Sequence, residues 1–158
     1  MDSIIKIKGL KKSYNNVKAV NSIDFYVDPG TLFAFLGPNG AGKSTTIDII
    51  STLLKPDEGE VIIDGYVLGK EDSPIRSSLG IVFQDSVLDN LLTVKENLLI
   101  RGGLYKMTRK QLAESVEYAA ECTGVTEFLN RPYGKLSGGQ RRRADIARAL
   151  INTPKILI

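Results

Sequence analysis

GPNGAGKST, residues 37–45, matches the pattern G-x-x-x-x-G-K-[ST]. It follows the apolar run TLFAFL at 31–36, which predicts a strand, and opens KSTTIDIISTLL at 43–54, which predicts a helix. The glycines at 37, 40 and 42 let successive backbone N–H groups converge on phosphate oxygens at the positive end of that helix. The stretch therefore predicts a loop that binds the phosphates of a nucleotide.

The composition is that of one globular domain or a piece of one, with 158 residues, 42% hydrophobic and 25% charged. A net charge of +3 is too small to indicate a nucleic-acid partner. Because there is no histidine and Cys122 is the single cysteine, a Cys/His zinc site and an internal disulfide are excluded. The apolar runs fall far short of the ~20 residues that a membrane helix needs, so no spanning segment is predicted.

Several short apolar runs bounded by turn residues predict strands. Asp64-Gly65 between EVIID and YVLG predicts a hairpin. SLGIVFQ at 78–84 predicts one more buried strand, and PKILI at 154–158 predicts another after Pro154 ends the preceding helix. Two earlier runs, IIKIKG at 4–9 and VNSIDFYV at 20–27, also read as strands.

Three pairs match the helix capping box, in which Ser or Thr precedes Glu or Gln by three residues. They are Thr93 and Glu96, Thr108 and Gln111, and Ser137 and Gln140. The second helix is expected to carry Leu112, Val116 and Ala119 or Ala120 on one face and to end at Gly124; the third is expected to reach about Ile151, with Ala144 and Ala147 on its apolar stripe. Arg141, Arg142 and Arg143 lie largely outside that stripe and predict a solvated face, with a raised potential for phosphate as the alternative.

The third helix starts in LSGGQ, residues 136–140. A helix cap explains Ser137 and Gln140, but two glycines just inside a helix cost about 1 kcal/mol each relative to alanine. Close approach of an anion to bare backbone N–H groups would account for them.

With these motifs in this order, the chain resembles the ABC ATPase family, the ATP-binding subunits of ABC transporters, over its whole length. GPNGAGKST is similar to the family's Walker A motif, and LSGGQRRRADIARAL is similar to its signature helix. Gln84 in GIVFQ matches the Q-loop glutamine, and Tyr14 stands where the family stacks an aromatic ring on adenine. The sequence is most similar to the ABC-2-type drug and antibiotic exporters.

The resemblance implies an α/β P-loop NTPase fold with a RecA-like core, an N-terminal antiparallel β subdomain and a helical insert. Residues 1–158 would be the N-terminal portion of one nucleotide-binding domain, with a core of 1–85 and 136–158 and a helical subdomain of about 86–135. In the family the strand matching PKILI leads to the Walker B Asp, a Mg²⁺ ligand, and then to a Glu general base. The sequence is therefore expected to be incomplete at its C-terminus, with hydrolysis negligible for these residues alone.

ATP and Mg²⁺ are the cofactors that the resemblance implies. Lys43 would reach the β- and γ-phosphates, Ser44 and Gln84 would hold Mg²⁺, and Lys43 and Gln84 would be the catalytic residues present. The signature residues Ser137, Gly138, Gly139 and Gln140 would act on the ATP of a partner cassette. The nucleotide would contact Tyr14, Gly37, Pro38, Asn39, Gly40, Ala41, Gly42, Lys43, Ser44 and Thr45.

The resemblance also implies partners and a place in the cell. Two cassettes, alike or different, would pair head to tail and drive export through a separate integral membrane permease, from the cytoplasmic face of the membrane. The alternatives are an ABC ATPase of translation or DNA repair, and a fragment that only binds nucleotide. No long coiled coil interrupts residues 45–136, which disfavours the repair type.

Overall fold

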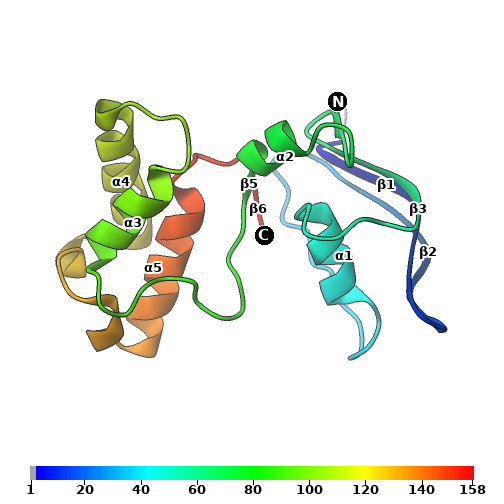
Figure 1. Ribbon diagram of the computed structural model, residues 1–158, viewed down its shortest axis with the longest axis horizontal. Helices are drawn as coiled ribbons and strands as arrows, with labels where there is room; N and C mark the ends of the chain where they lie inside the picture. Colours follow the sequence, from blue (N-terminus) through cyan, green and yellow to red (C-terminus); the bar gives the residue numbers. More distant parts are fainter. Residues whose placement is uncertain (1–2) are drawn as a thin grey trace. The chain divides into compact units, whose positions relative to one another are not determined.

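A computed structural model describes residues 3–158, and its contacts divide the chain into two compact units, residues 1–77 and 78–158. The first unit is an antiparallel sheet with one helix against it, and the second is a cluster of helices with a short parallel strand pair (Figure 1). Helix α2, Asp72–Ser78, spans the boundary between them.

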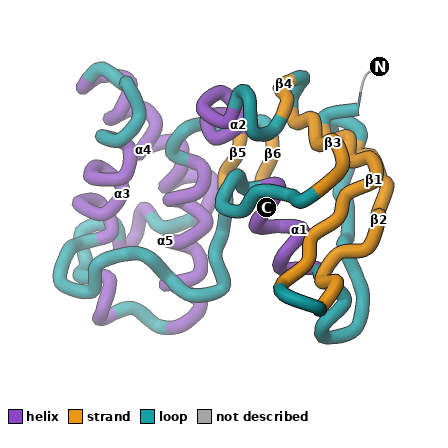
Figure 2. The backbone as a smooth tube through the Cα atoms, turned by 45° about the vertical axis from the view of Figure 1, so that its right-hand side comes forward, coloured by secondary structure: helices purple, strands orange, loops and turns teal. Residues whose placement is uncertain are grey.

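The first unit is built on a four-stranded sheet of order β2-β1-β3-β4, seen as adjacent orange strands in Figure 2. Ile5 and Ile7 of β1 are buried while Lys6 and Lys8 are not, the alternation expected of a strand with one face in the core. The strands are β1 Ile5–Tyr14, β2 Val17–Val27, β3 Glu58–Ile63 and β4 Tyr66–Val67.

The hairpin predicted at Asp64-Gly65 is confirmed. Ile63 of β3 pairs with Tyr66 of β4, and the two residues between them have φ of 51° and 83°. A tight turn of this kind needs positive φ at both central positions, which Asp and Gly tolerate.

Helix α1, Lys43–Ile50, buries Thr46, Ile49 and Ile50. It is shorter than predicted: its C-cap is Ser51, and Thr52 takes a positive φ of 61° that ends the helical backbone. Helix α2 was not predicted from the sequence; Ile75, fully buried, is its anchor in the core.

The strand predicted at 31–36 is wrong, because this segment pairs with no strand in the described part of the chain. Leu32 and Leu36 are 101% and 86% exposed, while the rings of Phe33 and Phe35 both lie 5.4 Å from that of Phe25 in β2. The apolar pattern alone does not make a strand; its backbone also needs a neighbouring ladder.

The second unit contains the three helices announced by capping boxes, and all three boxes are formed. Gly124 caps the second helix with φ of 65°, as predicted. The helices are α3 Val94–Gly102, α4 Arg109–Thr123 and α5 Gly138–Leu150, with 3₁₀ turns η1 Thr126–Phe128 and η2 Tyr133–Lys135 between the last two.

These helices share one core, to which α4 contributes Val116, Ala119 and Ala120, while Leu112 packs beside it partly buried. The predicted stripe of α5 is also confirmed, because Ala144, Ala147 and Ile151 are all fully buried. No helix of residues 3–158 is long and apolar enough to cross a membrane.

The strand predicted at 78–84 is confirmed only at Leu79–Gly80, which forms β5 and pairs in parallel with β6, Ile156–Leu157. The bonding runs one step further, since Val82 N donates to Ile158 O at 2.7 Å. Residues 81–84 form no strand, so the rest of the predicted strand is wrong. In β6, Ile156 is buried and Leu157 is half exposed.

Leu98→Ala should lower the free energy of unfolding by about 2–5 kcal/mol, because the Leu98 side chain is fully buried in the core of the second unit. Ile100→Ala is the matched control, since Ile100 lies on the same helix and is 60% exposed; its change should stay within about 0.5 kcal/mol. Urea unfolding followed by circular dichroism measures both. Equal losses would contradict the assignment of this core.

Candidate functional site

The loop 37–45 ends where α1 begins. Gly42 is the N-cap of α1, with φ of 80°, and no side chain caps this end. The first backbone bond of the helix runs from Thr46 N to Gly42 O at 2.9 Å, so the N–H groups of residues 43–45 precede the helical ladder. These donors and the helix dipole favour an anion at this position.

Gly42 also fixes the loop against β2. A Cβ at Gly42 would lie 2.1 Å from Ala19 O and 3.1 Å from a methyl carbon of Val20. A real side chain cannot come that close to backbone, so any other residue would push the loop away from the strand. The glycine is therefore required by packing as well as by its positive φ.

Lys43 is folded back over the loop. Its Nζ donates to Gly37 O and to Pro38 O, each at 2.7 Å. The ammonium group thus lies among the backbone groups that the sequence assigns to phosphate binding. A phosphate entering the loop would offer charged acceptors, which bind an ammonium group more strongly than neutral carbonyls do.

Ser44 and Thr45 follow at the start of α1, Ser44 exposed and Thr45 half-buried. Residues 3–158 contain no group of three or more acidic, histidine or cysteine side chains placed to hold a metal ion. A single hydroxyl beside a phosphate loop nevertheless fits Mg²⁺, which keeps several water ligands and is commonly bound through substrate phosphates. The donors present suit a metal that enters with the nucleotide.

Tyr14 ends β1 and is 48% exposed, with the Lys12 Nζ 5.9 Å from its ring centroid. Lys12 pairs with Val20, the residue against which Gly42 packs. Tyr14, two positions beyond Lys12, is therefore on the part of the hairpin that borders the phosphate loop. An exposed ring in this position can stack on a flat ligand.

The other predicted site residues belong to the second unit. Gln84 is exposed and lies in the irregular segment after β5. Ser137 Oγ accepts from Gln140 N at 3.3 Å, and Gln140 Oε1 accepts from Ser137 N at 3.0 Å, so both side chains cap α5. A Cβ added to Gly138 or Gly139 would meet nothing within 4 Å. Packing within the described residues therefore does not require either glycine.

The solvated face predicted at 141–143 is confirmed for Arg142 and Arg143, which are exposed, while Arg141 is half-buried; all three side chains also bond to backbone carbonyls. Arg141 donates to Leu136 O and Gly134 O, Arg142 to Phe83 O, and Arg143 to Gly124 O. A guanidinium has five N–H donors and satisfies backbone carbonyls left free by turns, which explains the arrangement. The arginines thus fasten α5 to neighbouring loops.

Asp145 and its partners were missed by the sequence analysis. Asp145 is only 7% exposed, and its Oδ1 accepts from Ser86 Oγ at 2.5 Å. Tyr133, which is 2% exposed, donates from its hydroxyl to the same carboxylate at 3.3–3.4 Å. Burial raises the pKa of Tyr133, so the phenol stays protonated and remains a donor. The sequence signal that could have indicated this site is an aspartate placed between the alanines of the apolar stripe of α5.

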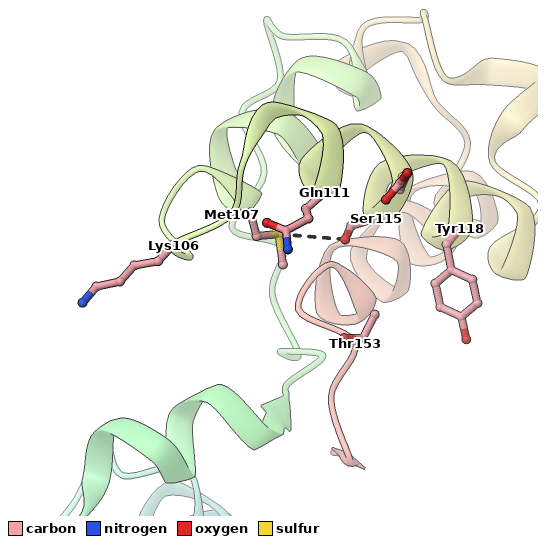
Figure 3. A pocket seen from close by; sticks show the side chains of 7 residues that line it. Lys106, Met107, Gln111, Ser115, Tyr118 and Thr153 are labelled. Atoms are coloured by element: carbon pink, nitrogen blue, oxygen red, sulfur yellow. Dashed lines mark hydrogen bonds between the residues drawn. The ribbon is translucent and has the colours of Figure 1, made fainter.

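A shallow pocket of about 410 Å³ lies beside α4, lined by Lys106, Met107, Gln111, Ser115, Tyr118 and others (Figure 3). Ser115 Oγ donates weakly to Met107 Sδ at 3.9 Å. None of the predicted site residues lines this pocket.

The curated relatives of the chain are ATP-binding proteins of resistance and export systems. It is 40% identical over 159 residues to the linearmycin resistance ATP-binding protein LnrL of Bacillus subtilis (strain 168), and 38% identical over 154 residues to the Nod factor export ATP-binding protein I of Rhizobium sp. (strain N33). Each match covers 98% of this chain but only 50% and 51% of the relative. The chain thus spans about half the length of the curated relatives it matches.

Solved structures give the same relationship. The chain is 31% identical to cbiO1 from Clostridium perfringens, part of an ABC transporter complex, with a TM-score of 0.89 over 99% of this chain and 64% of that one. It is 34% identical to a dimeric bacterial ABC transporter cassette, with a TM-score of 0.83 over 97% of this chain and 72% of that one. Residues 20–158 match the family model for the ABC transporter. The chain therefore belongs to the ABC transporter family and has the P-loop α/β fold of its ATP-binding cassettes.

Proposed function

We propose that the chain is the nucleotide-binding part of an ATPase subunit that drives export through a separate membrane permease. The observation that carries this proposal is the loop 37–45, where uncapped N–H groups of α1 and the Lys43 ammonium group lie together. Such a loop suits the phosphates of ATP. Membership of the family supports the same function.

In this proposal each predicted residue of the nucleotide site has a defined role. The backbone N–H groups of residues 39–45 bind phosphate oxygens, and Lys43 leaves the loop carbonyls for the β- and γ-phosphates. Ser44 would offer its hydroxyl oxygen to Mg²⁺ and Gln84 its amide oxygen, and the ion would neutralise developing phosphate charge. The exposed ring of Tyr14 stacks on adenine.

The signature residues Ser137 to Gln140 would act on ATP held by a second cassette, in a head-to-tail pair of like or unlike subunits. The open space around Gly138 and Gly139 supports an interface role, because a partner's phosphate can approach bare backbone there. One of the similar solved structures is a cassette dimer.

Export is the transport direction favoured by the relatives. Those named for linearmycin, daunorubicin and doxorubicin resistance and for Nod factor export point to the ABC-2-type exporter branch. We propose a cytoplasmic subunit attached to the inner face of the membrane by its permease.

The proposal also includes a division of the domain into a core of 1–85 and 136–158 and a helical subdomain of about 86–135.

Lys43→Ala, in the protein expressed from the complete reading frame, should reduce ATP hydrolysis by a factor on the order of 10² or more, because a preorganised charge on the transferred phosphate is lost. Phosphate-release assays with Mg²⁺-ATP measure this. Lys70→Ala is the control, since Lys70 is exposed in the same unit. Hydrolysis by Lys43→Ala at the wild-type rate would contradict the assignment of Lys43 to the transferred phosphate.

Gly138→Ala should raise the free energy of unfolding by a few tenths to about 1 kcal/mol, because the residue is helical and its surroundings are open. It should also abolish ATP-dependent association of two cassettes. Gly103→Ala is a matched control: φ is −62°, and the nearest atoms to an added Cβ are 3.4 Å away. Light scattering with and without ATP tests association. Undiminished pairing of the Gly138 variant would exclude this glycine from the interface.

A further inference from the structure

Three side chains on one side of α5 hold the segment that contains Gln84. Arg148 donates from Nη2 to Ile81 O, and Arg142 donates from Nη1 to Phe83 O at 2.7 Å. Asp145 accepts from Ser86 Oγ at 2.5 Å. Residues 142, 145 and 148 are spaced by three, so they project from neighbouring positions on the helix. The segment is therefore fastened on both sides of Gln84.

Of the three α5 side chains that hold this segment, Asp145 carries a buried carboxylate. A buried charge is unfavourable unless it is hydrogen-bonded, and the neighbouring Ala144 and Ala147 are fully buried. Its partners are the hydroxyls of Ser86 and Tyr133. Ser86 Oγ in turn accepts from Leu88 N at 3.2 Å, so the serine joins the helix to the backbone beyond Gln84.

Arg148 reinforces the same attachment. It is 6% exposed, and its guanidinium carbon lies 5.3 Å from the centroid of the Phe83 ring. Burial lowers the pKa of Arg148, and the nearby Asp145 carboxylate opposes that shift. A cation in this position stabilises both the ring and the buried carboxylate.

A second anchor lies further along the chain, in α3. Asn97, which is 6% exposed, donates from Nδ2 to Asp89 O and Thr93 O, each at 3.0 Å, and accepts from Asp89 N at 2.8 Å. Gln84 and Asp85 thus lie on a short exposed stretch between residues bonded to α5 and residues bonded to Asn97. The position of Gln84 then depends on the bonds to α5.

We propose that Asp145 is a positioning residue: through Ser86 and Tyr133 it fixes Gln84 relative to the signature residues at the start of α5. This inference rests on the proposed function, because it assigns a role in ATP hydrolysis to Gln84. It adds residues that neither nucleotide motif contains.

The test uses the protein expressed from the complete reading frame, with Asp145→Ala, Ser86→Ala and the double variant. Each single variant should lower kcat by tenfold to a hundredfold, as a displacement of about 1 Å at a reacting group can, while KM for ATP changes less than about twofold. The double variant should lose no more than the worse single one, because both remove the same bond. Ser86→Thr, which keeps the hydroxyl group, should have a kcat close to that of the wild type.

Hydrogen–deuterium exchange supplies a readout independent of activity. Amides of residues 81–88 should exchange at least about tenfold faster in Asp145→Ala and in Ser86→Ala. Exchange in the phosphate loop should not change. Glu117→Ala, which removes an exposed acid of the same unit, is the charge-matched control and should match wild type in both assays.

The possible failures are distinguishable. If the wild-type protein neither binds nor hydrolyses ATP, the proposed function fails. If the wild type is active but Ser86→Ala keeps wild-type kcat and exchange, the positioning role of Asp145 is overturned. Because Ser86 is exposed, that variant remains informative even if Asp145→Ala does not fold.

Discussion

The N-terminal N–H groups of a helix have no carbonyl partners within their own helix, and this constraint organises both units of the protein. In α3, α4 and α5 a complete capping box satisfies them. In α1 the cap is Gly42, whose backbone is left-handed and which offers no side chain. The donors of α1 therefore stay available to an anion, and the loop that leads to them is pinned by close packing on β2.

In the second unit, helix α5 carries polar groups of two kinds. The first turn of α5 presents two glycines with open space around them, while its middle buries Asp145 and Arg148. Asp145 accepts from Ser86 and Arg148 donates to Ile81 O, so these two residues impose a defined path on the segment 81–86, although the buried Nε of Arg148 has no hydrogen-bond partner among the described residues. Open glycine backbone and buried polar contacts thus lie on one helix, α5.

The structural features that the sequence predicted correctly are those determined by residues close together in the chain. The capping boxes, the turn at Asp64-Gly65, the Gly124 cap and the buried stripe of α5 depend on neighbours within a few residues, and all are present. The segment 31–36 and the extent of the strand at 78–84 depend on ladder partners distant in sequence, and there the pattern misled. Asp145 was missed for a similar reason, since its partner Ser86 lies 59 residues away. The loop 37–45 and the start of α1 were predictable because their glycines, lysine and helix are contiguous, while phosphate binding there stays a prediction.

Crosslinking between two copies tests most directly whether the phosphate loop and the signature helix serve one nucleotide. In a Cys122→Ser background, one copy carries Asn39→Cys and the other Gly139→Cys, joined by a short bifunctional maleimide. Crosslinking between the copies is predicted to be strong with Mg²⁺-ATP under non-hydrolysing conditions and weak without nucleotide. Equal crosslinking with and without ATP, or none although both copies bind ATP, would contradict a shared site.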